Sequence, residues 1–108
     1  MTRRLLDFLE SDLGEWSVIF RVHAAQRMFK RFIEEREVRE LLTIGEIIEE
    51  YQFDFPFPSV LVSGVSGNKR PLHAVVGINA DARVLYLITL YEPDPQKWSG
   101  NFNRRILP

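Results

Sequence analysis

The stretch Val84-Leu85-Tyr86-Leu87-Ile88 decides the fold, because it is apolar at every successive position. Side chains of a β-strand alternate between the two faces of its sheet, and a strand that is apolar on both faces has to be covered on both. We therefore expect this stretch, as part of a strand over Val84–Tyr91, to be the central strand of a sheet.

Other strands are expected on the N-terminal side of this one. Turn residues at Gly67-Asn68 and at Ala80-Asp81-Ala82 separate β-rich segments, which is typical of consecutive hairpins. The prolines of Gln52–Pro58 predict an extended loop, and we expect its Phe53, Phe55 and Phe57 to pack over an edge of the core. Counting from the N-terminus, the other predicted strands are 16–22, 46–51, 60–65 and 72–79.

Three helices are predicted before the run of strands, and Gly14 and Gly45 mark two of their ends. They cover 3–13, 23–31 and 35–44, and residues 32–34 form a link short enough for a helical hairpin. The predicted fold class is α+β, with N-terminal helices packed on one face of a small antiparallel sheet. Residues 1–14 form an extra N-terminal helix in this scheme, and residues 93–108 form a tail anchored by Trp98.

The helix His23-Ala24-Ala25-Gln26-Arg27-Met28-Phe29-Lys30-Arg31 separates its side chains into two arcs. One arc is apolar and is predicted to enter the core, namely Ala24, Ala25, Met28, Phe29 and Phe32. The other arc carries His23 and three cations, and no acidic residue occurs between Trp16 and Ile33. Such a face suits an anion, although a solvated helix face would have the same pattern.

Length and composition limit the possible functions. The 108 residues predict a single domain, 1–108, and the absence of cysteine excludes disulfides, thiolate zinc sites and a cysteine nucleophile. No segment is apolar enough to span a membrane, so we expect a cytoplasmic protein with no membrane partner. The net charge of −1 predicts only weak long-range attraction to a polyanion.

Three blocks of sequence resemble a known family. They are His23-Ala24-Ala25-Gln26-Arg27-Met28, Pro71-Leu72-His73-Ala74-Val75-Val76, and Ile88-Thr89-Leu90-Tyr91-Glu92-Pro93-Asp94. Together, over about residues 17–105, they look like a small bacterial domain family of unknown function that is allied to the RelE/BrnT group of toxin-like domains. The resemblance implies helices on a small antiparallel sheet, a neutralising antitoxin-like protein as partner, and in some relatives cleavage of mRNA.

The resemblance and the residues together predict an RNA-binding domain or a metal-independent endoribonuclease of a toxin–antitoxin type system. Histidine exchanges protons near neutral pH, so His23 and His73 are the candidate catalytic acid and base, and we expect their rings to share one site. No cofactor and no metal site are expected. The candidate anion- and RNA-binding residues are Arg27, Arg31, Lys69, Arg70, Tyr91, Arg104 and Arg105.

A second interpretation of the chain involves no catalysis. It is a protein-binding module, held by a partner protein or paired with a second copy as a homodimer through the sheet edge or the Phe53-Phe55-Phe57 loop. Under this interpretation His73 is a histidine bonded across the sheet, and Arg27 and Arg31 form ion pairs with the glutamates of residues 34–50. Two observations distinguish the interpretations. One is whether His23, His73 and the arginines converge on a common cleft, and the other is whether a short neighbouring open reading frame encodes an antitoxin-like protein.

Overall fold

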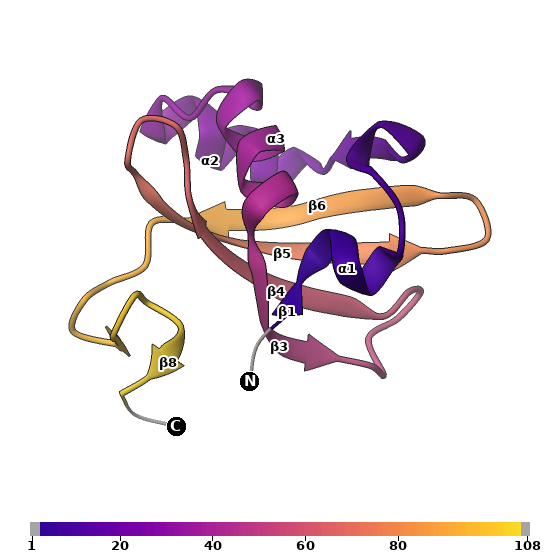
Figure 1. Cartoon of the computed structure of the whole chain (residues 1–108). Helices are drawn as coiled ribbons and strands as arrows, with labels where there is room; N and C mark the ends of the chain where they lie inside the picture. The colour runs from indigo at the N-terminus through magenta and orange to yellow at the C-terminus, as the bar shows by residue number, and fades with distance from the viewer. Residues whose placement is uncertain (1–2, 107–108) are drawn as a thin grey trace.

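The computed structural model of the chain describes residues 3–106, and its main feature is a mixed six-stranded sheet combined with three helices (Figure 1). In chain order the elements are β1 Arg3–Arg4, α1 Leu5–Leu9, the 3-10 turn Leu13–Glu15, β2 Ser17–Phe20, α2 Val22–Arg31, α3 Glu35–Ile44, β3 Glu46–Tyr51, β4 Ser59–Val65, β5 Pro71–Asn79, β6 Val84–Tyr91, β7 Trp98–Ser99 and β8 Arg104–Arg105. The α+β class is therefore confirmed.

The strand order in the sheet is β1-β3-β4-β5-β6-β2, and one of its pairings differs from the prediction. All neighbours are antiparallel except β2, which runs parallel to β6. The consecutive strands β3 to β6 are joined by loops and turns that reverse the chain. Strand β2, by contrast, is separated from β3 in the sequence by the helices α2 and α3. No turn fixes the direction of β2, so the sheet is mixed rather than antiparallel.

The middle of the sheet is formed by β4 and β5, which corrects the prediction that the Val84–Tyr91 strand is central. Strand β6 lies next to the border and is flanked there by β2, which has only four residues. The face of β6 that points away from the main hydrophobic cluster is therefore only partly covered. Tyr86 lies under the ring of Phe57, whereas Ile88 is exposed.

The N-terminal segment is less helical than the sequence pattern predicts. Arg3 and Arg4 form β1 by pairing with β3, and α1 ends at Glu10, whose φ of 55° lies in the left-handed region. A capping box between Asp12 and Glu15 then begins the 3-10 turn, so Gly14 lies inside that turn and does not follow a helix. This turn leads directly into β2.

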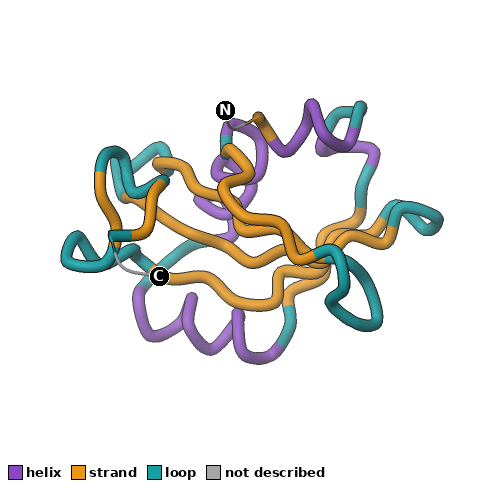
Figure 2. The backbone as a smooth tube through the Cα atoms, turned by 90° about the horizontal axis from the view of Figure 1, so that it is seen from below, coloured by secondary structure: helices purple, strands orange, loops and turns teal. Residues whose placement is uncertain are grey.

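One hydrophobic cluster joins the helices to the sheet. Helix α3 packs against β4 and α1, whereas α2 lies along β6, apart from α1 and α3 (Figures 1 and 2). The buried members of the cluster are Leu5, Trp16, Ala24, Ile33, Val38, Leu41, Leu42, Ile47, Val60, Val62, Leu72, Ala74, Val76, Ile78, Leu85, Leu87 and Leu90.

Helix α2 buries much less of its apolar arc than predicted. Ala24 is fully buried and Met28 partly so, but Ala25 is exposed, and the side chains of Phe29 and Phe32 are 86% and 84% exposed. The helix touches the sheet along a narrow line at its border, because only the small Ala24 and the flexible Met28 face the strands. Phe32 also ends the helix with a φ of 55°, beyond the last helical turn.

The remaining loops agree with the predictions in part. Trp98 is buried and anchors the tail, in which β7 and β8 pair as a hairpin. Phe57 stacks on Tyr86, which lies on the face of β6 opposite the main hydrophobic cluster. Phe53 and Phe55 are 97% and 94% exposed, which corrects the expectation that they pack over an edge of the core.

Candidate functional site

His73 lies beneath the C-terminal segment 96–106, which we call the strap. Its neighbours Leu72 and Ala74 belong to the main hydrophobic cluster, so the alternation along β5 places the His73 ring on the opposite side of the strand. There the ring is fully buried. Its Nε2 lies 2.6 Å from the carbonyl oxygen of Phe102, and its Nδ1 lies 3.2 Å from the hydroxyl of Tyr91.

These two contacts define the protonation state of the ring. A carbonyl oxygen only accepts hydrogen bonds, so Nε2 carries the proton and donates it to Phe102, and Nδ1 accepts from the Tyr91 hydroxyl. Burial holds the pKa of His73 below its usual value, against the opposing effect of the Phe102 carbonyl. His73 is therefore neutral at pH 7, with both nitrogens engaged inside the chain.

The strap is fixed by an aromatic contact and an ion pair. The indole of Trp98 meets the His73 ring edge-on at 4.5 Å between centroids, and the guanidinium of Arg105 lies 4.7 Å from the Trp98 ring centroid. Arg105 also grips Glu49 of β3 with both nitrogens, Nε at 2.6 Å and Nη2 at 3.1 Å. The strap is thus bonded to β5 at His73 and to β3 at Glu49.

Glu49 and Tyr51 complete this network on β3. The hydrogen bond from Arg105 holds the pKa of Glu49 below its usual range, so Glu49 is ionised. The pKa of Tyr51 is raised to about 12, mainly by burial and secondly by the hydrogen bond that the Tyr51 hydroxyl donates to Glu49. The polar groups under and beside the strap thus form two bonded sets, His73 with Tyr91 and Phe102, and Glu49 with Tyr51 and Arg105.

A second region, on α2 and β2, has the opposite character. Ile19 of β2 and Val22, Phe29 and Phe32 of α2 all expose large apolar side chains, with Val22 at 74%. Two of these side chains, Val22 and Phe29, line a hollow of about 590 Å³ together with Phe20, Ala25, Gln26 and Lys30. We call these residues, with Ile19 and Phe32, the α2–β2 surface.

Strand β2 also leaves one edge of the sheet open within residues 3–106, because it is the last strand in the order. Ser17 and Arg21 donate their backbone N–H groups to Arg83 and Leu87 of the β6 side. In a parallel pair every second residue bonds to the neighbour, so Val18 and Phe20 direct their N–H and C=O groups to the open edge.

The cations around this surface have no acidic partners in the described chain. The ion pairs there use Arg36, Arg39, Arg70, Arg83 and Arg105, and none involves Arg27, Lys30 or Arg31. The predicted ion pairs from Arg27 and Arg31 to the glutamates of residues 34–50 are therefore wrong. Of those glutamates, Glu34, Glu35 and Glu40 pair with arginines of α3. Glu37 pairs with Arg70 and Glu49 with Arg105.

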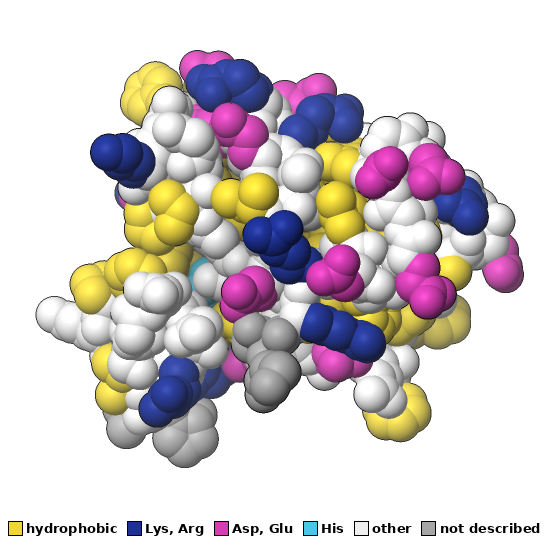
Figure 3. Space-filling view, viewed as in Figure 1, with side chains coloured by type: hydrophobic (Ala, Val, Ile, Leu, Met, Phe, Trp, Pro, Cys, Tyr) yellow, Lys and Arg dark blue, Asp and Glu magenta, His cyan; other side chains and the backbone are white. Residues whose placement is uncertain are grey.

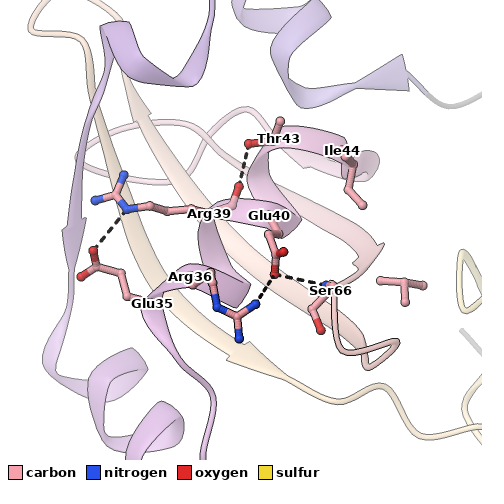
Figure 4. A pocket seen from close by; sticks show the side chains of 9 residues that line it. Glu35, Arg36, Arg39, Glu40, Thr43, Ile44 and Ser66 are labelled. Atoms are coloured by element: carbon pink, nitrogen blue, oxygen red, sulfur yellow. Dashed lines mark hydrogen bonds and ion pairs between the residues drawn. The ribbon is translucent and has the colours of Figure 1, made fainter.

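Helix α3 shows this internal neutralisation in detail. Beside it lies a hollow of about 710 Å³, where Arg39 pairs with Glu35 and Arg36 with Glu40 (Figure 4). On the face shown in Figure 3, basic and acidic side chains alternate without a broad area of one sign. Neither feature resembles a surface for a polyanion.

The structure does not bring His23 and His73 together. His23 is exposed on α2, whereas His73 is enclosed under the strap and bonds only to Tyr91 and Phe102. The expectation that the two rings share a site is therefore wrong, because the strand alternation turns His73 away from the cluster that receives α2.

The other predicted site residues are also dispersed. Arg27 and Arg31 are exposed on the unbroken helix α2, while Arg104 is exposed on the strap. Lys69 is exposed in the β4–β5 turn, with a φ of 60°. Tyr91 bonds to His73, and Arg105 bonds to Glu49.

Arg70 has a structural position. Its guanidinium donates to the carbonyl oxygens of Arg31 and Phe32, at the end of α2, and pairs with the buried Glu37 of α3 at 3.6 Å. These contacts tie the β4–β5 turn to both helices.

Sequence reasoning missed Glu49, Phe29 and Phe32 as site residues. The sequence does contain a signal for Glu49, because Glu49 and Tyr51 are two residues apart in the 46–51 strand and therefore share one face of it. Phe29 and Phe32 were assigned to the core because they share an arc with Ala24. A helix wheel shows which residues share a face but does not show how wide a face the sheet covers.

The part of the chain that the structure describes contains neither a metal-binding cluster nor a helix that could span a membrane. Within residues 3–106 no three His, Asp or Glu side chains gather closely enough to hold a metal ion. The helices of that same part of the chain are all too short and too polar to cross a bilayer.

Comparison with known proteins gives one match. The model of a family described as "Domain of unknown function (DUF4258)" matches residues 20–92, from β2 to the end of β6. No curated protein and no solved structure matches the chain. The matched segment contains α2 and His73 but not the strap.

Proposed function

This chain belongs to the DUF4258 family, whose description names no activity, and we propose from the geometry that it is a non-catalytic protein-binding module. The observation that carries the proposal is the α2–β2 surface, on which Phe29 and Phe32 are almost fully exposed. Phe29 also shares a hollow with Phe20, the last residue of the edge strand β2. Large apolar side chains gathered at one place on a small domain mark an interaction site.

The histidines support this reading over catalysis by an acid–base pair. His73 is neutral, buried and bonded at both nitrogens, and His23 stands alone on a helix. A general base has to reach the proton that it removes, within hydrogen-bond distance. Within residues 3–106, both ring nitrogens of His73 are occupied by Tyr91 and Phe102, which supports a structural role for this ring.

The toxin-like reading is a second candidate for the same helix. The exposed arc of His23, Arg27 and Arg31, without an acidic neighbour, favours contact with an RNA backbone. The RelE/BrnT relationship and an antitoxin-like partner belong to this candidate. It predicts affinity that falls steeply with salt, whereas an interface centred on Phe29 and Phe32 predicts only a moderate salt effect.

Site-specific photo-crosslinking tests the proposal. A photo-reactive phenylalanine analogue replaces Phe29 in living source cells, and the same analogue replaces Phe53 as a matched control, since both side chains are almost fully exposed. We expect a discrete protein adduct from position 29 and not from position 53.

The captured protein is then purified, and its Kd is measured for Phe29→Asp and Phe53→Asp. A buried interface anchor predicts a loss of about thirtyfold for Phe29→Asp and less than about twofold for Phe53→Asp. RNA as the adduct at position 29 would replace the protein-binding reading with the toxin-like one. A stronger loss for Phe53→Asp would move the interface to the β3–β4 loop.

A further inference from the structure

We infer that the partner of the α2–β2 surface is an extended, acidic segment of another protein, which adds to the open edge of β2 as a seventh strand. This inference rests on the proposed function and specifies the chemistry of its partner. Three independent features of the surface carry it, namely its backbone groups, its hollow and its charge.

The backbone groups of β2 favour an extended partner. Val18 and Phe20 together direct two N–H and two C=O groups outward, and no backbone group within residues 3–106 bonds to them. An extended segment satisfies such a row by continuing the ladder, as in strand addition at a sheet edge. A helix laid along α2 would leave these four groups unpaired by protein.

The hollow beside β2 favours apolar side chains at alternate positions. It begins at Phe20, the last residue of β2, and continues along α2 past Val22 and Phe29. Side chains of an added strand alternate between two faces, so those on the face of Phe20 enter this hollow. The side chains between them project to the face of Ile19 and Arg21.

Charge distinguishes the class of partner. Between Glu15 and Glu34 the chain carries Arg21, Arg27, Lys30 and Arg31 and no acidic residue. Lys30 borders the hollow, and Arg21 lies on the other face of β2, with its guanidinium 4.8 Å from the Tyr86 ring centroid. In an added strand that alternates apolar and acidic residues, the carboxylates project to the face of Arg21, while Lys30 lies at the border of the hollow that takes the apolar side chains.

The same charges argue against a second copy of this chain. A two-fold axis at β2 would bring the cations of one copy against the same cations of the other. Like charges facing each other across an interface oppose association. An acidic segment from a different protein avoids this repulsion.

Peptide titration with NMR-detected hydrogen exchange tests the inference on the full chain. The probe is a capped eight-residue peptide of alternating valine and glutamate, and its control has lysine in place of every glutamate. We expect the glutamate peptide to bind at least about tenfold more tightly at low salt, with a smaller ratio at high salt.

Hydrogen exchange gives the more specific result. At saturation we expect the amides of Val18 and Phe20 to exchange about tenfold more slowly, with no change at Ile19, whose amide already faces β6. A glutamate peptide N-methylated at alternate residues, on the side that faces β2, should lose binding. Phe29→Asp should also weaken the glutamate peptide, and Phe53→Asp should not.

The outcomes separate this inference from the proposed function. Peptide-induced shifts at Phe29 without protection of Val18 and Phe20 would overturn strand addition and leave the docking surface intact. Equal binding of the lysine peptide would overturn the acidic partner. A single-stranded oligouridylate that binds this surface when neither peptide does would overturn both and favour the toxin-like reading.

Discussion

The neutral state of His73 predicts that its contribution to stability disappears in acid. His73→Phe keeps a ring of similar size between Trp98 and Tyr91 but removes the donor to the Phe102 carbonyl and the acceptor for the Tyr91 hydroxyl. Each hydrogen bond contributes about 1 kcal/mol net, so the variant should lose about 2 kcal/mol near neutral pH. For a domain of this size that corresponds to a Tm lower by about 8 °C.

The pH dependence follows from the direction of the pKa shift. Burial places the pKa of folded His73 below the usual histidine value of about 6.5, so acid protonates this residue in the unfolded chain first. The stabilisation is complete above that value and is lost as the pH falls from it through the folded pKa. The free-energy gap between wild type and His73→Phe should therefore be largest near pH 8 and shrink steadily toward pH 5.

Urea denaturation of both proteins between about pH 5 and pH 8 measures this gap. His23→Gln serves as the control, since His23 is the other of the two histidines and is exposed. Because its side chain is exposed, His23→Gln should change the free energy of unfolding by less than about 0.5 kcal/mol near neutral pH. A gap that stays constant or widens in acid would refute the assignment of a neutral, strap-bonded His73.

Two further substitutions test how the helices are held, each with a control on the same chain and urea denaturation as the measurement. Glu37→Gln should cost about 3 kcal/mol, because the buried Glu37 accepts hydrogen bonds from Ser66 and from the Glu34 backbone and pairs with Arg70. The control Glu35→Gln breaks only an exposed ion pair and should cost less than about 0.5 kcal/mol. Equal losses in the two variants would contradict a role for the buried carboxylate of Glu37. Gly45→Ala should cost about 1–3 kcal/mol, because the new Cβ would lie 2.4 Å from both the Leu41 carbonyl oxygen and Val62 Cγ1. In the control Gly14→Ala the new Cβ has no atom within 4 Å, so stability should change by less than about 0.5 kcal/mol. A Gly45→Ala variant as stable as the wild type would show that α3 and β4 are not in close contact.

Local patterns in the sequence determined most of the secondary structure. Alternation and turn residues located β3 to β6 within one residue at each end, and glycine and apolar spacing located α2 and α3. These signals are local, because strand alternation and helix periodicity depend on neighbouring residues alone. The same reasoning identified Trp98 as the tail anchor.

Tertiary structure decided what each face contacts. The sequence assigned Phe29 to the core, but α2 touches the sheet along so narrow a line that Ala24 and Met28 suffice to cover it. The sequence placed His73 beside His23, but the strap covers one side of β5 and the main hydrophobic cluster covers the other. Local periodicity states which residues share a face, whereas the position of a helix over a sheet and the path of a tail depend on contacts between distant residues, which no local pattern contains.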